Sequence, residues 1–228
     1  MDQTIISIPL KVPCYLIKIT DGFIIIDTGD NSDCGALEKA LDQAGVTPKN
    51  LKLIILTHGD FDHSGNATFL HQKYGVKIAM HADDAGIVER GDQNWNRKGK
   101  SDKISLFGRI IIFISSRLAR PVQFKPFTAD LLIVDGQNLS EYGFNAQVLL
   151  LPGHSKGSIG ILTKEGNLFC GDLLMNMFKP DLHFMIDNYA DFIASIKKLK
   201  GLNIKMVFPG HGKPFPFEQF IHNHQNLT

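Results

Sequence analysis

The segment that decides the fold reads Thr57-His58-Gly59-Asp60-Phe61-Asp62-His63, and it directly follows the apolar run Leu53-Ile54-Ile55-Leu56. His58, Asp60, Asp62 and His63 are of the residue types that bind metal ions. Residues two apart in an extended loop point the same way, so His58 and Asp60 can converge on one ion while Asp62 and His63 turn toward another. The spacing therefore predicts one half of a site for two metal ions.

The other half of such a site must lie elsewhere in the chain, because two metals need more ligands than one short loop supplies. Three further segments fit, and each is a short apolar run that ends in a turn with glycine. They contain Pro152-Gly153-His154-Ser155-Lys156-Gly157-Ser158, Gly171-Asp172 and Pro209-Gly210-His211-Gly212. Strand ends hold side chains rigidly, and glycine lets the backbone approach the site. His154, Asp172 and His211 are thus candidate ligands.

This ordered set, HxDxDH, PGHSxGS, GD and PGHG, preceded by Ile26-Asp27-Thr28-Gly29, resembles the metallo-β-lactamase superfamily over nearly the whole chain. The resemblance implies that a first metal is held by His58, Asp60 and His154, a second by Asp62, His63 and His211, and that Asp172 bridges both. It also implies an α/β fold, a four-layer αββα sandwich in a single domain spanning residues 1–228. The pattern of strands with interspersed helices favours the same two-sheet core.

One position departs from the usual HxHxDH motif of the superfamily, since Asp60 stands where the middle histidine is expected. A carboxylate adds a negative charge and a hard oxygen donor, which favours iron or manganese more than three histidines would. The exchange resembles the flavodiiron branch, where an acidic residue occupies this position and iron is bound. Alternatively, Asp60 is too short to reach the ion and leaves the first site weak or empty. We expect two divalent ions, with zinc first and iron or manganese as alternatives.

Composition narrows the possible partners and location. The 228 residues are 43% hydrophobic, enough for a substantial core in one domain. A formal net charge of +1 gives no basic field for nucleic acid. Cys14, Cys34 and Cys170 form no CxxC pair, and the N-terminus does not resemble a signal peptide. We expect a cytoplasmic protein that acts on a small-molecule substrate, with no transmembrane segment and a possible homo-oligomer.

Residues 92–127 form an insertion that stands apart from the pattern of strands and helices. A polar stretch leads into the apolar run 104–114, which Arg109 interrupts and which is too short to span a bilayer. It can be a helix that covers the pocket or packs on the domain, a membrane-surface helix, or an interface between subunits. The first of these is favoured, because apolar insertions near active sites usually shape a pocket.

The remaining elements follow from periodicity and turn signals. The Asp21-Gly22 pair predicts a hairpin, and Gly75 is placed to end a helix. We expect strands near 4–8, 14–19, 23–27, 53–56, 76–80, 130–134, 146–151, 158–163 and 167–170, and helices near 33–44, 67–74 and 189–200.

Four further residues are given roles beside the ligands. Asp62 is predicted to orient the nucleophile or accept its proton, in addition to holding the second metal. His183 falls where relatives often place a residue that contacts the substrate, and the alternative is a surface or packed histidine. Asp27 and Thr57 are expected to orient the ligands through hydrogen bonds, because a carboxylate in a buried turn commonly accepts N–H bonds from metal-binding histidines.

Three classes of function follow from these residues. In the leading one, hydroxide held between two metals attacks an ester, thioester, lactone or lactam, and one metal polarises the carbonyl. The second is an iron-dependent redox enzyme of the same fold, to which Asp60 points. The third is a binding or sensing module with a weakened first metal site. The metal core alone does not choose among substrates.

Overall fold

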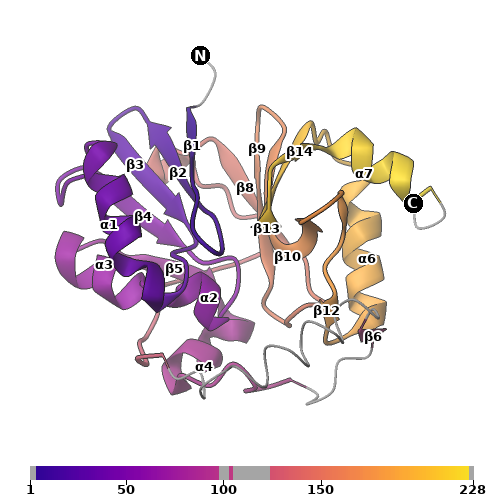
Figure 1. Cartoon of the computed structure of the whole chain (residues 1–228), viewed down its shortest axis with the longest axis horizontal. Coiled ribbons are helices and arrows are strands. Elements are labelled where there is room, and N and C mark those ends of the chain that lie inside the picture. The colour runs from indigo at the N-terminus through magenta and orange to yellow at the C-terminus, as the bar shows by residue number, and fades with distance from the viewer. Residues whose placement is uncertain (1–3, 98–102, 105–123, 226–228) are drawn as a thin grey trace.

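The computed structural model describes residues 4–97, 103–104 and 124–225 of the chain. Most of the predicted insertion at 92–127, including residues 105–114 of its apolar run, lies outside the described residues, so the pocket-covering and interface roles stay predictions. Figure 1 shows two halves that meet face to face, the first in indigo and magenta and the second in orange and yellow.

The first half is built on a six-stranded sheet that begins with an antiparallel meander. Gly22 pairs with Ile19 across the tight turn, which confirms the hairpin predicted from Asp21-Gly22. From the third strand onward the pairing is parallel. In order across the sheet the strands are β1 (Ile5–Ile8), β2 (Cys14–Ile19), β3 (Gly22–Ile26), β4 (Leu51–Ile55), β5 (Ile78–His81) and β7 (Leu131–Ile133).

The second sheet has the order β14-β13-β10-β9-β8, with β11 beside β10. Its central pair, β10 and β13, runs parallel and carries two of the candidate ligands. A separate short pair joins β6 (Lys103–Ile104) to β12 (Met185–Ile186). The strands of the second sheet are β8 (Ala146–Leu150), β9 (Ile159–Thr163), β10 (Asn167–Asn176), β11 (Asp181–Leu182), β13 (Met206–Gly212) and β14 (Phe215–Pro216).

The helices lie on the outer faces of the sheets or at the end where the two halves meet (Figure 1). The outer helices are α1 (Cys34–Gln43) and α3 (Ala67–Tyr74) on the first sheet, and α6 (Tyr189–Leu199) and α7 (Phe217–Asn223) on the second. The meeting end holds α2 (Phe61–Ser64) and α4 (Ala82–Arg90), and two single turns are η1 (Asn31–Asp33) and η2 (Ser140–Tyr142). None of the helices that the structure describes is long and apolar enough to cross a membrane.

Three buried clusters define four layers. Alternate residues of one strand point to opposite faces, so Leu16 and Ile25 pack against α1 and α3, while Tyr15 and Ile24 face the other sheet. There they meet Phe169 of β10 in the core between the sheets. A third cluster lies between the second sheet and its helices α6 and α7. The predicted αββα sandwich is therefore confirmed.

Candidate metal centre

The candidate ligands lie at the end of the two sheets where α2 begins. His58 and Asp60 belong to the loop that follows β4, whereas Asp62 and His63 lie in the single turn of α2. The remaining three come from the second half of the molecule. His154 sits in the loop between β8 and β9, Asp172 within β10, and His211 within β13.

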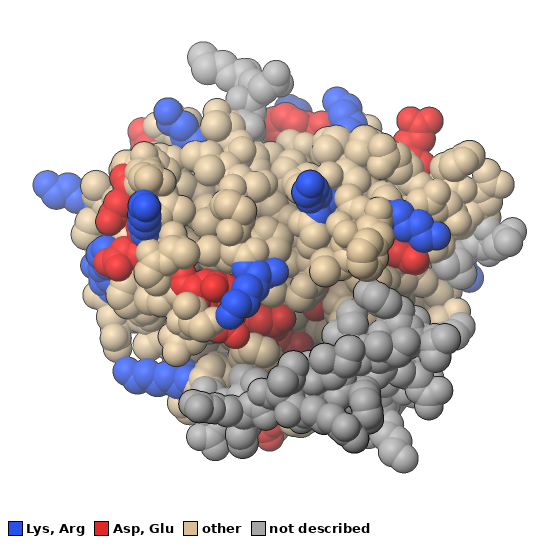
Figure 2. All heavy atoms as spheres, viewed as in Figure 1, with Lys and Arg blue, Asp and Glu red and all other residues tan. Residues whose placement is uncertain are grey.

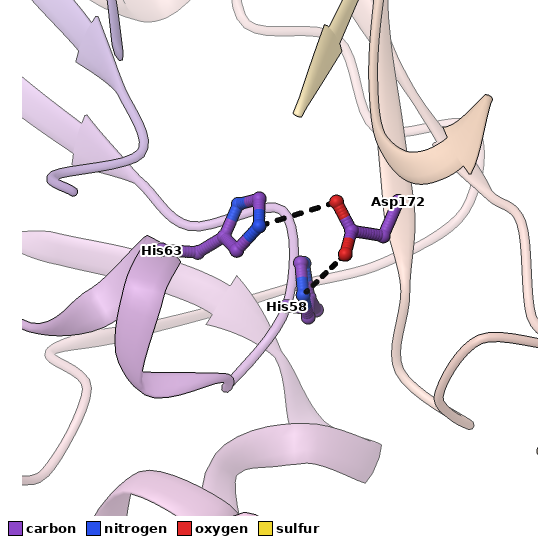
Figure 3. A group of neighbouring side chains, drawn as sticks. All are labelled: His58, His63 and Asp172. Atoms are coloured by element: carbon purple, nitrogen blue, oxygen red, sulfur yellow. Dashed lines mark ion pairs between the residues drawn. The ribbon is translucent and has the colours of Figure 1, made fainter. Parts of the chain in front are cut away.

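Asp172 lies at the centre of this arrangement, and its two carboxylate oxygens together face histidines from both halves of the molecule. Its Oδ1 is 3.2 Å from His63 Nε2, and its Oδ2 is 3.9 Å from His58 Nε2. Figure 3 shows the two histidines on the first half of the molecule and Asp172 opposite them on β10. Oδ2 also lies 3.7 Å from His154 Nε2 and 3.3 Å from His211 Nε2.

The possible ligand atoms form overlapping groups in which all members lie within 4.8 Å of one another. Ligands at about 2.1 Å from a tetrahedral ion lie roughly 3.4 Å apart, so the separations from Asp172 are those expected for shared ions. One group is His58, Asp60 and His154, and another is Asp62, His63 and His211. These are the sets that the sequence assigned to the first and second metals.

In three of the histidines, Nδ1 is the ring nitrogen that points away from the centre, and it is hydrogen-bonded to the protein. His154 Nδ1 lies 2.9 Å from the carbonyl oxygen of Met185, which can only accept, so Nδ1 carries the proton. His63 Nδ1 is held in the same way by the Asp27 carboxylate at 2.9 Å. His58 Nδ1 lies 3.0 Å from the hydroxyl of Thr57. This tautomer leaves each Nε2 lone pair directed at the centre, as metal-binding histidines require.

Several atoms at the centre lack hydrogen bonds, which tests whether metal ions fit. His58 Nε2, His63 Nε2 and Asp172 Oδ1 are buried and make no hydrogen bond with any residue that the structure describes. Buried polar atoms are rarely left unpaired, because each costs about 1–3 kcal/mol. Two imidazole nitrogens and one carboxylate oxygen that converge in this way are a good donor set for a divalent ion such as zinc.

Asp27 and Thr57 make the orienting contacts expected of them. The Thr57 hydroxyl donates to Asp27 Oδ2 at 2.8 Å, and the Thr57 backbone N–H donates to Asp27 Oδ1 at 2.8 Å. Asp27 therefore links the His63 ring to the residue that holds His58. It follows β3 directly with a φ of 58°, a backbone conformation that aspartate tolerates better than most residues.

Two glycines allow the two halves to approach each other closely. A side chain on Gly171 would come within 2.6 Å of the Thr57 hydroxyl, and its φ of 49° also disfavours other residues. A side chain on Gly210 would overlap the carboxylate of Asp172 and the ring of His63. The glycines of the GD and PGHG motifs thus make room for the ligands beside them.

The pKa values of the histidines and the carboxylate at the centre are shifted in different directions. Burial lowers the pKa of His58 well below its usual value, and the neighbouring His63 adds to this. Burial also opposes protonation of His63, but the carboxylates of Asp172 and Asp27 outweigh it and raise the pKa of His63 well above its usual value. Burial would raise the pKa of Asp172, yet the histidines around it, His183 first, hold that pKa well below the usual range. In the metal-free centre the carboxylate of Asp172 is therefore charged, His58 is neutral, and the protonated form of His63 is favoured.

The sequence pattern that defines the metallo-beta-lactamase superfamily matches residues 8–211, which include all seven candidate ligands. The chain belongs to this superfamily of metallo-hydrolases. It is 31% identical over 192 residues to hydroxyacylglutathione hydrolase GloC of Haemophilus influenzae, covering 82% of this chain and 79% of that protein. It is 27% identical over 219 residues to acyl-coenzyme A thioesterase MBLAC2 of Gallus gallus, covering 90% of this chain and 74% of that protein.

Among solved structures, the chain is similar to BLEG-1 B3 metallo-beta-lactamase. The TM-score is 0.75 with 26% sequence identity, and the match covers 99% of this chain and 100% of that one. Members of the superfamily bind divalent metal ions, often zinc, and the clusters of histidine and aspartate described above can hold such ions. The fold and the donor set of this metallo-β-lactamase superfamily member agree with each other.

Asp84 is a buried carboxylate that the sequence did not point to. It lies on α4, is 1% exposed, and accepts three hydrogen bonds. Gly59 N and Ser155 Oγ donate to its Oδ2 at 3.1 and 2.6 Å, and Gly157 N donates to its Oδ1 at 2.7 Å. Asp84 thus joins the loop of His58 and Asp60 to the loop of His154. Only its position in the first turn of a helix could have drawn attention to it.

Arg97 is the second residue that the sequence left without a role. Its Nη2 lies 2.5 Å from Asp60 Oδ1, and both side chains are nearly buried, at 11% and 9% exposure. The other oxygen of Asp60 faces the centre, 3.2 Å from His154 Nε2 and 3.7 Å from His58 Nε2. Asp60 is therefore long enough to reach the first group of ligands, and it shares its carboxylate with an arginine.

His183 reaches the centre as well. It is 2% exposed, and its Nε2 lies 3.3 Å from Asp172 Oδ2, so it is not a surface histidine. Its ring stacks on Phe184 and on His211. Unlike the three histidines above, it accepts a bond at Nδ1, from the backbone N–H of Met185 at 3.3 Å. The Met185 carbonyl is farther from this nitrogen, at 3.5 Å, and already accepts from His154.

Proposed function

We propose that this protein is a dinuclear metal-dependent hydrolase that cleaves a small acyl substrate. The observation that carries the proposal is the position of Asp172, whose two oxygens face the two groups of ligands at separations suited to shared ions. His58, Asp60 and His154 would hold the first ion, Asp62, His63 and His211 the second, and Asp172 both. When bound, two divalent ions supply Lewis acidity toward a carbonyl and lower the pKa of a water toward about 7.

Two residues of the second group, Asp62 and His211, face the open side of the centre. The side chains of Asp62 and His211 are 24% and 22% exposed, whereas those of His58, His63 and Asp172 are at most 4% exposed. We therefore infer that the substrate approaches from the side of Asp62. The carboxylate of Asp62 can orient the attacking water and accept a proton from it, and would thus act as a general base. Figure 2 shows acidic side chains near the middle of the face that it displays.

His183 donates a hydrogen bond to the leaving group in this proposal. Because its Nδ1 accepts from Met185, its Nε2 carries the hydrogen and can donate into the centre. Burial lowers the pKa of His183 to about 3, which keeps the ring neutral. A neutral imidazole with its N–H directed at the reacting atoms is suited to donate a hydrogen bond to a leaving sulfur or oxygen, and the proton that Asp62 takes from the water would then pass to the leaving group.

Thioesters are the first substrate class to test. The curated relatives named above are a hydroxyacylglutathione hydrolase and an acyl-coenzyme A thioesterase. Both names denote thioester hydrolysis, and esters, lactones and lactams share the same attack on a carbonyl. We propose zinc as the metal, and the metal analysis described below identifies the bound ion.

The proposal predicts two ions per chain and hydrolysis that depends on them. Purified protein is analysed for metals and then assayed with S-acyl glutathione, acyl-coenzyme A, an alkyl ester, a lactone and a β-lactam. We expect turnover of a thioester, loss of turnover after chelation, and recovery when zinc is added back. Bound iron with oxygen consumption would instead place the protein among the redox enzymes. A single bound ion without turnover would indicate a binding module.

Replacing His183 with alanine should lower kcat without removing metal. We expect a decrease of about 10²–10³, the usual effect of removing one donor to developing charge, because the leaving group then departs without its hydrogen bond. Metal content measured on the same sample separates this role from ligation. The exposed His222 of α7 is a matched control, and His222→Ala should leave kcat unchanged. Loss of an ion in His183→Ala would show that this histidine is a ligand instead.

A further inference from the structure

The carboxylate of Asp60 has two partners on opposite sides. Oδ1 is bound by the guanidinium of Arg97 at 2.5 Å, while Oδ2 is directed at His58 and His154. Asp60 is the N-cap residue of α2, where an aspartate commonly accepts a backbone N–H, yet its side chain makes no such bond. Both oxygens of the Asp60 carboxylate thus have partners, Arg97 for Oδ1 and the histidines of the first group of ligands for Oδ2.

The burial of this pair makes its charge important. Asp60 and Arg97 are both nearly buried, and an uncompensated charge in such a place is strongly unfavourable. The first group of ligands has two neutral imidazoles, so Asp60 alone would give it a charge of −1. With the arginine included the sum is zero, which is the charge of three histidines. The arginine therefore removes the difference in net charge between the first ligand group of an HxDxDH motif and that of an HxHxDH motif.

Arg97 is brought to this place by the segment that follows α4. Trp95 of this segment packs against the buried core of the first half, and the guanidinium of Arg90 lies 4.8 Å from the centre of its ring. Lys156, close to His154, donates to Asn96 Oδ1 at 2.5 Å. The segment is therefore attached to both halves of the molecule, and Arg97 is held between its attachments and Asp60.

We propose that Arg97 is a positioning residue of the first metal site. It holds Oδ1 of Asp60 so that only Oδ2 is offered to the ion, and it offsets the added negative charge. The inference rests on the proposed dinuclear site. It assigns the metal preference of that site to the Asp60–Arg97 pair, which resembles a neutral ligand and therefore favours zinc. The carboxylate alone would favour manganese or iron.

The test is a double-mutant cycle read out as metal affinity. Asp60→His, Arg97→Met and the double variant are compared with the unchanged protein by competition with a chelator for zinc and for manganese. Asp60→His should weaken first-site zinc binding at least about tenfold, since it leaves Arg97 beside a cation without its counter-charge. The double variant should recover zinc binding to within about threefold of the unchanged protein.

Arg97→Met alone should shift the site toward manganese by about tenfold relative to zinc, because the free carboxylate is a harder and more negative ligand. The metal-free form of this variant should also unfold at a lower temperature, and Arg97→Lys should restore part of both properties. Lys49→Met is the control, because Lys49 is exposed in the loop before β4 and takes no part in the contacts that hold Arg97, so it should leave both affinities unchanged.

Equal zinc affinities for Asp60→His and the double variant would overturn the role of Arg97 while leaving the dinuclear site intact. Failure of the unchanged protein to bind two ions would overturn the dinuclear site, and this inference with it. Since the double variant removes both buried charges together, it can be measured even if Arg97→Met does not fold.

Discussion

Replacing Asp172 with asparagine should remove both metal ions and reduce hydrolysis to background. Asp172 Oδ2 lies 3.9 Å from His58 Nε2 of the first group and 3.3 Å from His211 Nε2 of the second, and Oδ1 lies 3.2 Å from His63 Nε2 of the second. No other carboxylate among the described residues has oxygens in contact with both groups of ligands. Asparagine keeps the size but has no charge and only one oxygen. Loss of a residue that merely orients a ligand weakens metal binding by about 10–100-fold, so loss of a bridging ligand should exceed this range.

The measurement is metal content after dialysis, together with the rate of thioester hydrolysis. Asp21→Asn serves as the control, because Asp21 is exposed in the turn between β2 and β3 and is remote from the centre. An Asp172→Asn protein that retains two tightly bound ions would contradict the bridging role. Retention of one ion would assign Asp172 to a single site.

Most of the fold could be predicted because the strands carry strong local signals. The hairpin at Asp21-Gly22 and the helix closed by Gly75 are as expected, and both depend on residues close in sequence. The strand expected at 167–170 instead runs from Asn167 to Asn176. Register shifts on both sides of Gly171 let it continue beside β13, with Leu173 and Leu174 still buried. The glycine that was taken to end the strand bends it.

Helix α7 was not predicted, although Phe217 and Phe220 have helical spacing and both are buried. The helix is short, at 7 residues, and follows Pro214 and Pro216, so its periodicity is too brief to separate from a loop. Its stability comes from packing on the second sheet, in the third hydrophobic cluster.

The candidate site could be predicted where its residues belong to short sequence motifs. The seven candidate ligands are metal-binding residue types that lie in short motifs, and the fold brings them together. Asp84 and Arg97 have no such local signature. Asp84 contacts residues 25 to 73 positions away, and Arg97 meets Asp60 across 37 positions. Only the packing of α4 and the following segment reveals them. From sequence alone Asp60 adds charge to the first site, whereas the structure adds an arginine that offsets it.

Replacing Asp84 with alanine should lower the free energy of unfolding by at least about 3 kcal/mol. The reason is the loss of one acceptor for three buried donors, each of which costs about 1–3 kcal/mol when left unpaired. Gly59 N, Ser155 Oγ and Gly157 N all donate to this carboxylate. Burial raises the pKa of Asp84, while the bonds from Ser155 and Gly157 oppose that rise and favour the charged form.

The neighbouring Asp83 provides a matched control on the same helix. Its side chain is 57% exposed, so Asp83→Ala should change stability by less than about 0.5 kcal/mol. Urea unfolding of the metal-free proteins gives both values. Because Asp84 connects the loop of His58 to the loop of His154, its alanine variant should also bind the first ion more weakly, which a chelator competition measures. If Asp84→Ala and Asp83→Ala had equal stability and equal metal affinity, the two loops would have to be held in place by the sheets alone.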